Sequence, residues 1–314
     1  MTPTRIGDAV ETGTSAAGAV ESGLVIATYR RHYDIALDHG EHVACVLKGR
    51  SLQIAVGDRV EIQRTADGGA IEAVRARTNL IYRSDAFKEK LLAANVTQIA
   101  GVVAPDLTLD EELINRWMIA AEAADCRFLL FANKTDLPEF TELRRRLAPY
   151  AALGYAIVEL SAKREAAPAL PWLADRHTVL VGQSGMGKST LINALLPDAA
   201  VRTTEISNAL QAGRHTTTST TLYPLPALGG DTWIVDSPGM KAFGLAHLEP
   251  SRIAEAFVEM RPFLGHCRFR DCRHDEEPGC AVTAAVAAGR VAPHRLALLH
   301  ALLAEANYAR AKGR

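Results

Sequence analysis

The sequence predicts an α/β domain with a mostly parallel sheet, preceded by a small β-barrel and followed by a mainly helical domain. Two observations support the central domain. From about residue 97 onward, apolar runs of strand length alternate with segments of helical periodicity, which is typical of a parallel sheet with helices on both faces. Polar and glycine-rich motifs also follow directly after several of these strands, where such sheets bind their ligands.

The composition is that of a globular chain with no membrane segment. Its 314 residues allow two or three domains of about 100–200 residues each. No apolar run approaches the ~20 residues of a membrane helix, so we expect no membrane partner and a cytoplasmic location. The formal net charge of −1 argues against a strongly basic nucleic-acid binder, although local patches can still bind nucleic acid.

The amino-terminal part divides into an extension and a barrel. Residues 1–20 are rich in small and polar residues and lack the apolar core of a signal peptide, so we expect a disordered extension there. In 21–80, short β-prone segments at 24–29, 42–47, 56–62 and 70–74 are separated by turn signals. With one more strand that these signals do not place, five short strands in this region fit a barrel of the oligonucleotide-binding (OB) type, and an SH3-like barrel remains an alternative.

The α/β domain is expected over 81–247. We expect strands at 98–104, 128–132 and 156–160, with helices at 111–123 and from Pro138 onward. Further strands are expected at 177–181 and 233–235, and a helix at 189–196. Because the carboxyl ends of parallel strands meet at one edge of a sheet, the motifs that follow these strands should lie close together.

A phosphate loop follows the strand at 177–181, and a helix follows the loop, which is the context that supports such a motif. Its glycines let the backbone wrap around phosphate groups with N–H groups pointing inward. Lys188 would place a charge between the β and γ phosphates, and the Ser189 hydroxyl would bind Mg²⁺. The loop comprises Gly182, Gln183, Ser184, Gly185, Met186, Gly187, Lys188 and Ser189.

A segment after another strand selects guanine among the bases. The Asp136 carboxylate can accept two hydrogen bonds from N1–H and the exocyclic amine of guanine. Adenine lacks this amine and would leave the carboxylate unpaired, at a cost of about 1–3 kcal/mol. Lys134 can lie along the base plane, and Asn133 can tether neighbouring loops. The segment Ser161, Ala162 and Lys163 would offer a backbone N–H to the guanine oxygen, so the ligands are GTP and GDP.

The motifs come in a permuted order. The base-reading segments precede the phosphate loop, and the segment at 236–239, with the sequence Asp-Ser-Pro-Gly, comes last. An ordinary GTPase starts with the phosphate loop. Here the segments that respond to the γ-phosphate end the domain and lead directly into the carboxyl-terminal region. This order favours a nucleotide-driven switch acting on that region.

Magnesium ligands are expected at both ends of the nucleotide. Asp236 at the end of its strand can hold Mg²⁺ through water, and Gly239 can donate its N–H to the γ-phosphate. A threonine from the segment at 213–218 should complete the Mg²⁺ shell together with Ser189. The spacing to Asp236 favours Thr217, with Thr216 as the alternative.

The attacking water needs an orienting group. Met240 follows Gly239 at the position where Ras-type enzymes carry the glutamine that orients this water. Methionine cannot perform that task, so either a partner supplies the group or another residue of the chain does. His215 is the internal candidate, because an imidazole of near-neutral pKa can orient or accept a proton from water.

A cysteine cluster predicts a metal site in the expected helical domain at 248–314. Three cysteines and one histidine form a closed tetrahedral set for one structural Zn²⁺, and the absence of a secretory signal favours metal over disulfides. The spacing differs from that of a C2H2 finger and from the deaminase pattern. The ligands are Cys267, Cys272, His274 and Cys280. Helices are expected at 251–264 and 293–310.

Together, the permuted order, the Gly-Arg-His-Thr-Thr segment at 213–217 and the Cys-x4-Cys-x-His-x5-Cys cluster resemble the RsgA (YjeQ) family of circularly permuted bacterial GTPases. The resemblance runs from about residue 23 to the end. It implies an OB barrel, a GTPase domain and a zinc-binding domain. It also implies binding of the small ribosomal subunit and its 16S rRNA near the decoding region. GTP hydrolysis would be stimulated by that subunit and followed by release, and we expect a monomer.

The resemblance also assigns individual residues. It implies zinc ligation by the cluster just named, and it makes His215 the catalytic histidine. We count Lys188 and Thr217 with His215 as candidate catalytic residues. The nucleotide-binding residues that it implies are Asn133, Lys134, Asp136, Gly182 to Thr190, and Asp236 to Gly239.

Three other functions stay open. The leading barrel and the cysteine cluster argue against a permuted GTPase that acts on the large subunit. The presence of intact Lys188, Ser189 and Asp236 argues against an RNA-binding module with an inactive nucleotide site. A metal-dependent RNA-processing enzyme would need an open metal position, which a set of four protein ligands does not leave.

Overall fold

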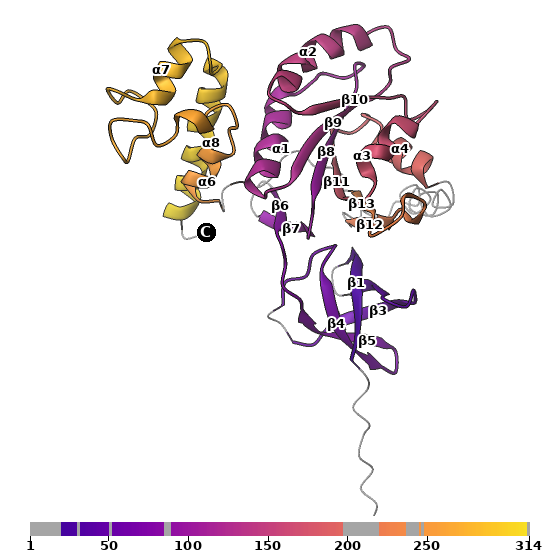
Figure 1. The fold of residues 1–314 in the computed structure, drawn as a ribbon. Helices are drawn as coiled ribbons and strands as arrows, with labels where there is room; N and C mark the ends of the chain where they lie inside the picture. The colour runs from indigo at the N-terminus through magenta and orange to yellow at the C-terminus, as the bar shows by residue number, and fades with distance from the viewer. Residues whose placement is uncertain are drawn as a thin grey trace, which may run out of the picture.

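The computed structural model describes residues 20–29, 32–49, 52–84, 89–196, 220–236, 245 and 248–312. Figure 1 shows a barrel, a central α/β domain and a helical domain beside it, which confirms the expected fold class. The extension expected at 1–20 lies outside the described residues except for Val20, which begins the first strand. The domain boundaries given above remain predictions.

The barrel closes on itself. Its strands are β1 (Val20–Thr28), β2 (Tyr33–Leu37), β3 (His42–Leu47), β4 (Arg59–Thr65) and β5 (Gly68–Val74). They follow the order β1-β2-β3-β5-β4, and β4 pairs back to β1. The β3–β5 pair is parallel and the other pairs are antiparallel. This closed five-stranded arrangement is the expected OB-type barrel.

Alternating side chains build the barrel core. Along β3, Val43 and Cys45 are buried while their neighbours face outward, as the period of two in a strand requires. They pack with buried residues of the other strands, including Ile35, Ile62 and Ile71. Ile35 belongs to β2, the strand that the sequence analysis did not place.

The central sheet has the expected parallel core. Its order is β10-β9-β8-β11-β13-β12, and only β12 runs antiparallel to its neighbour in this set. The strands are β8 (Gln98–Val103), β9 (Arg127–Ala132), β10 (Ala156–Glu159), β11 (His177–Val181), β12 (Thr221–Pro224) and β13 (Trp233–Asp236). A hairpin of β6 (Leu80–Ser84) and β7 (Glu89–Ala94) joins the barrel to this sheet and was not expected.

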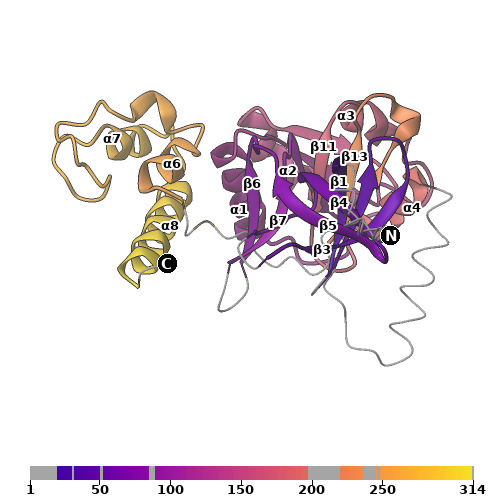
Figure 2. The same ribbon diagram turned by 90° about the horizontal axis from the view of Figure 1, so that it is seen from below.

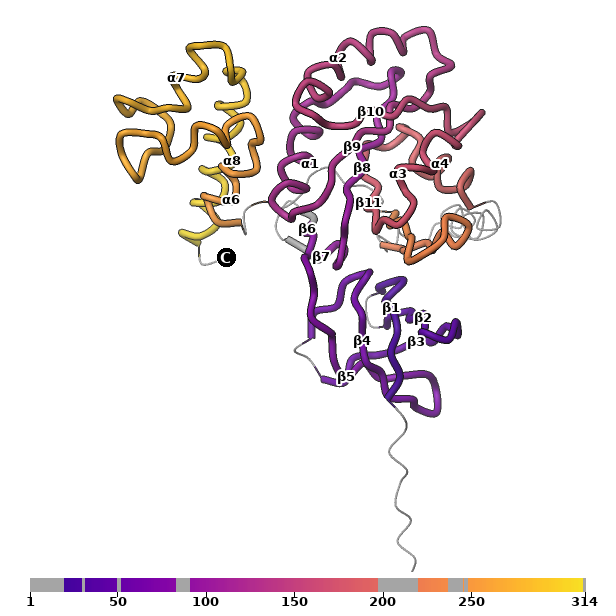
Figure 3. Tube along the Cα trace, viewed as in Figure 1, coloured from indigo at the N-terminus to yellow at the C-terminus, as the bar shows by residue number. Residues whose placement is uncertain are grey.

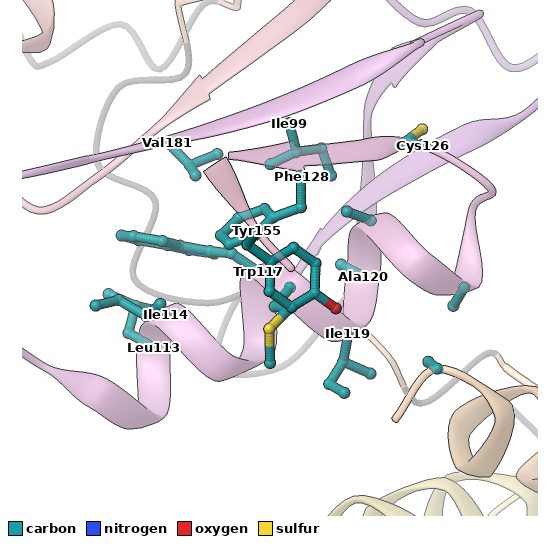
Figure 4. Packing of buried hydrophobic residues seen from close by; sticks show 14 of the residues in the cluster. Ile99, Leu113, Ile114, Trp117, Ile119, Ala120, Cys126, Phe128, Tyr155 and Val181 are labelled. Carbon is teal, nitrogen blue, oxygen red and sulfur yellow. The ribbon is translucent and has the colours of Figure 1, made fainter. Parts of the chain in front are cut away.

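Helices cover both faces of the sheet (Figure 1). The helices α1 (Glu111–Ala123) and α2 (Phe140–Ala152) pack on one face, and α3 (Leu170–Leu173) and α4 (Lys188–Leu195) on the other. Along β8, Ile99 and Val103 face the first pair of helices, whereas Ala100 and Val102 face the second. Figure 4 shows the first core, with Trp117 of α1 among Ile99, Phe128 and Val181.

The ends of the parallel strands bring the motifs together. Asn133 follows β9, Ser161 follows β10 closely, Gly182 follows β11, and Asp236 ends β13. Because β9, β10, β11 and β13 run in one direction, these residues lie along one edge of the sheet. The motifs therefore lie along one edge of the sheet, as expected from the strands that precede them.

The helical domain differs from expectation in two elements. The single helix expected at 251–264 is wrong: α6 (Pro250–Glu255) ends early and a 3₁₀ turn spans Arg261–Phe263. Pro262 within that turn has no N–H to continue a helix through 264, and Phe257 and Met260 in the segment between α6 and the turn are buried. The helix α8 (Pro293–Ala311) is confirmed, and α7 (Ala281–Ala287) was not expected. Short 3₁₀ turns also occur at Ala167–Ala169 and Pro226–Leu228.

The two outer domains meet the central domain in different ways. The barrel strand β1 pairs with β12, which makes the barrel and the sheet continuous. The helical domain instead lies beside α1, as the two perpendicular views in Figures 1 and 2 show. Figure 3 traces the path of the chain from the barrel through the sheet to α8. Among the described residues, no helix combines the length and apolar character needed to cross a bilayer.

Candidate nucleotide site and metal centre

Asn133 ties three loops of the candidate nucleotide site together. Its side chain is almost fully buried, and its Nδ2 donates to the carbonyl oxygen of Met186 in the phosphate loop at 2.9 Å. Its Oδ1 accepts a hydrogen bond from the Ala162 N–H at 2.9 Å. The base-reading, phosphate and 161–163 loops are thus fixed to one another, which is the tethering expected of this residue.

Lys134 bridges the base-reading and phosphate loops. Its backbone adopts a left-handed conformation with φ of 65°, which is uncommon for a residue other than glycine. Its Nζ donates to the Gly185 carbonyl oxygen at 2.9 Å and to the Asp106 carboxylate at 2.6 Å. The amine is therefore held by two loops that precede and follow it in sequence.

The surroundings of Asp136 favour its ionised form, which accepts hydrogen bonds. The Ser161 hydroxyl donates to its Oδ1 at 2.7 Å, and the Arg164 guanidinium lies 3.5 Å from its Oδ2. The hydrogen bond from Ser161 is the main cause that lowers the pKa of Asp136 below its ordinary value. An ionised carboxylate at this position has the acceptor character that the N1–H and amine of guanine require.

The phosphate loop requires glycine where it meets the base-reading loop. Gly187 has a φ of +103°, and a Cβ there would collide with the Asn133 side-chain amide. The helix α4 begins at the next residue, so its unpaired N–H groups face the loop. Of the remaining loop residues, Met186 is buried, Gln183 is half-buried, and Ser184, Ser189 and Thr190 are exposed.

Lys188 and Asp236 share a poorly solvated region. The Lys188 side chain is buried, and its Nζ donates to the carbonyl oxygens of Gly182 at 2.5 Å and Gln183 at 3.1 Å. Burial lowers the pKa of Lys188 and raises that of Asp236, while each partly offsets the other by its charge. A half-buried carboxylate at the end of β13 beside the amino end of α4 suits a hydrated Mg²⁺ with phosphates, so these residues fit the ion.

Several candidate residues lie outside the described part of the chain. His215, Thr216 and Thr217 fall within 197–219, and Gly239 and Met240 fall within 237–244. Their expected roles therefore stay predictions.

The cysteine cluster has the dimensions of a zinc site. Cys267 Sγ and Cys280 Sγ are 3.9 Å apart, and each lies 3.5 Å from His274 Nδ1. A tetrahedron with the usual Zn–S and Zn–N bond lengths has edges of about 3.8 Å between sulfurs and about 3.5 Å between sulfur and nitrogen. With Cys272, all four ligand atoms lie within 4.8 Å of one another, so the set fits one Zn²⁺.

Backbone groups support the thiolate ligands. The Ala281 N–H donates to Cys267 Sγ, and the Thr283 N–H donates to Cys280 Sγ, both at 3.4 Å. Such bonds favour the ionised form that binds metal. His274 adopts a left-handed backbone with φ of 63°, and its carbonyl oxygen lies 3.0 Å from His300 Nε2 of α8.

Sequence reasoning missed two residues of these sites. Asp106, which contacts Lys134, follows the end of β8 just as Asn133 follows β9, so the strand-end rule could have identified it. His300 lies on a helix far from the cysteine cluster in sequence, and no local pattern marks its contact with His274.

Comparisons with known proteins agree with this geometry. The family model described as RsgA GTPase matches residues 74–246. A small ribosomal subunit biogenesis GTPase RsgA of Burkholderia pseudomallei (strain K96243) is 49% identical over 297 residues, covering 92% of this chain and 94% of that protein. A protein of the same name from Paraburkholderia phytofirmans is 49% identical over 294 residues, with 91% and 93% coverage.

Two solved structures share the fold. YjeQ from Thermotoga maritima superimposes with a TM-score of 0.68 and 29% identity, covering 92% of this chain and 99% of that chain. YloQ, a circularly permuted GTPase, gives a TM-score of 0.66 and 24% identity over 94% of this chain and 98% of that chain.

Proposed function

This chain belongs to the RsgA family of GTPases, and from that premise we propose that it acts in late maturation of the small ribosomal subunit. It would bind that subunit and its 16S rRNA as a cytoplasmic monomer and hydrolyse GTP to GDP and phosphate. The observation that carries the proposal is the edge of the sheet where Asn133 fixes the base-reading and phosphate loops to each other. The names of the relatives supply the small subunit as partner.

The nucleotide would bind along this edge in two parts. Asp136 would accept from the guanine N1–H and amine, Lys134 would lie along the base, and Asn133 would hold the loops in place. The Ala162 N–H already donates to Asn133, and Ser161, Ala162 and Lys163 would lie on the guanine side. The phosphates would be held by Gly182, Gln183, Ser184, Gly185, Met186, Gly187, Lys188, Ser189 and Thr190.

Hydrolysis would use residues at the phosphate end. Bound Mg²⁺ would neutralise phosphate charge, and Ser189, Asp236 and Thr217 would hold it. Lys188 already lies over the loop in contact with its carbonyl oxygens. If the amine exchanged these carbonyl oxygens for phosphate oxygens, the positive charge of Lys188 would lie where negative charge builds up during the reaction. His215 would orient the attacking water, and the Gly239 N–H would contact the γ-phosphate.

The carboxyl-terminal domain would respond to this chemistry. Its zinc would be structural, held by Cys267, Cys272, His274 and Cys280. Loops ordered by γ-phosphate and Mg²⁺ and released on hydrolysis are a known switch type. Because the segment at 236–239 leads into α6, which begins at Pro250, hydrolysis would reorient the zinc domain against the subunit and drive release.

The test is GTP turnover by the full-length protein with purified small subunits, with large subunits as the control. We expect a large increase with small subunits alone, and loss of most of that increase in His215→Ala while GDP affinity is retained. Stimulation by large subunits alone would overturn the proposed partner. Subunit binding without any turnover in the unmodified chain would instead indicate an RNA-binding module with an inactive nucleotide site.

A further inference from the structure

A third loop reaches the base-reading segment. The turn after β8 places the Asp106 carboxylate 2.6 Å from Lys134 Nζ. The same turn lies against the phosphate loop, since a Cβ built on Gly185 would come within 3.1 Å of Leu107 Cδ1. Among the described residues, Lys134 is the single ion-pair partner of Asp106.

Lys134 needs such a partner for geometric reasons. Its side chain is a flexible four-carbon stem with a strongly hydrated charge at its end. For the stem to lie along a purine, the amine must be anchored beyond the edge of the base. The Gly185 carbonyl accepts one of its three N–H groups but supplies no counter-charge, whereas the Asp106 carboxylate supplies both an acceptor and the opposite charge.

We propose that Asp106 is a positioning residue for guanine nucleotides, which anchors the Lys134 amine so that its methylene groups lie against the base. The proposal rests on the proposed function of the base-reading loop. GTP and GDP present the same base to Lys134, so Asp106 should favour both to the same extent. Such uniform binding changes KM and leaves kcat unaltered.

The solvent exposure of the two side chains sets the size of the expected change in nucleotide affinity. The Lys134 and Asp106 side chains are 26% and 40% exposed, and exposed ion pairs contribute little on their own. We expect Asp106→Asn to raise the Kd for a fluorescent GDP and for a non-hydrolysable GTP analogue by about two- to fivefold each. Asp106→Glu, which keeps the charge, should restore part of the affinity. Subunit-stimulated kcat should stay unchanged.

A double-mutant cycle identifies the partner through which Asp106 acts. In a Lys134→Met background, Asp106→Asn should cause no further loss, because the amine that it anchors is gone. An unchanged Kd in Asp106→Asn, or an equal loss in the Lys134→Met background, would overturn the proposal. Glu142→Gln is the matched control, because it removes an exposed carboxylate paired with Arg145 on α2 and should leave both Kd values unchanged.

One further variant, at Asp136, distinguishes failure of the Asp106 proposal from failure of the proposed base-reading site. Asp136→Asn should weaken GDP binding and favour xanthosine diphosphate, whose base carries a carbonyl in place of the guanine amine. If Asp136→Asn left GDP binding intact, the proposed base-reading site would be wrong. If it weakened GDP binding while Asp106→Asn did not, only the role of Asp106 would fail. Thermal unfolding of every variant checks that it folds.

Discussion

The central domain meets its two neighbours through different kinds of interaction. At the barrel, backbone pairing joins the two domains, and the buried Ile26 and Val56 side chains pack into the core of the central domain. The strand β1 pairs with β12, and the Ala94 N–H donates to the Val56 carbonyl oxygen at 2.8 Å. At the zinc domain, apolar packing on α1 is accompanied by charged side chains that converge on α1 and the turn that follows it.

The charged junction is centred on a buried arginine. Arg295 of α8 is 4% exposed, and its Nε lies 2.5 Å from a carboxylate oxygen of Glu259. Its Nη1 donates to the Asn115 side chain of α1 at 2.9 Å, and its guanidinium stacks over Phe257 at 4.6 Å. A buried charge is tolerated only when it is paired and hydrogen-bonded, so the stability of this junction depends on the few atoms that pair with Arg295.

The peripheral contacts of the same junction are exposed. Arg116 of α1 pairs with Glu305 of α8, and Arg261 pairs with Glu122 of α1. Exposed pairs of this kind contribute about 0–1 kcal/mol each. The barrel junction should therefore be sensitive to changes in backbone geometry, whereas the zinc junction should respond strongly to loss of its one buried arginine.

The largest expected effect concerns the metal. Structural Zn²⁺ contributes about 10–16 kcal/mol of apparent binding free energy in small zinc domains. Cys272→Ala should therefore unfold the zinc domain while the β1–β12 junction stays protected, as hydrogen exchange of both regions would show. The control is Cys45→Ala, which removes a buried thiol in the barrel. This variant should still bind zinc at the cysteine cluster. A folded, metal-free Cys272→Ala protein with full subunit affinity would contradict a structural zinc.

The next effect is the loss of the buried arginine. Arg295→Ala leaves the Glu259 carboxylate buried without its counter-charge, and we expect a loss of about 3–5 kcal/mol in the free energy of unfolding of the zinc-domain junction. Denaturant titration measures it. The matched control is Arg310→Ala, which removes an exposed pair with Glu249 and should cost less than about 1 kcal/mol. Equal losses in the two variants would show that the junction does not depend on buried charge.

A backbone change tests the barrel junction. Gly57 has a φ of +87°, and a Cβ there would collide with the Ala94 carbonyl oxygen. Gly57→Ala should therefore cost about 2–3 kcal/mol through strain and steric overlap. Gly40→Ala is matched in conformation, with a φ of +95° and nothing within 4 Å, and should cost about 1 kcal/mol. If the two variants unfolded alike in denaturant, close backbone approach would not define this junction.

The smallest effect is a pH dependence within the barrel, away from both junctions. Hydrogen bonds from Arg64 lower the pKa of Glu41 from 4.5 to about 2. Because the folded pKa lies below the unfolded value, this stabilisation is present above pH 4.5 and is lost as the pH falls towards 2. Glu41→Gln should flatten the acid limb of the stability curve. An unchanged slope would assign the acid sensitivity to other carboxylates.

Local patterns accounted for much of the fold. The helix at 111–123 was placed from periodicity, because burial on one face imposes a regular spacing on apolar residues. The strand at 177–181 was placed from its short apolar run, which is typical of a strand buried on both faces. The helix expected at 251–264 was wrong: α6 ends at Glu255, and Pro262 lies in a separate 3₁₀ turn that cannot continue as a helix. The hairpin of β6 and β7 was missed, and its pairing depends on contacts between two strands rather than on spacing within one.

The sequence by itself determined which chemical groups the chain carries and along which edge of the sheet they lie. Motif order and strand direction were enough to place the base-reading loop, the phosphate loop and Asp236 together, and cysteine spacing was enough to predict a metal site. The tertiary structure alone decided which side chains touch. The contacts between Asp106 and Lys134 and between Asn115 and Arg295 join residues 28 and 180 positions apart. Such pairs follow from how the elements pack against each other, and a single polar contact between distant elements leaves no periodic trace in the sequence.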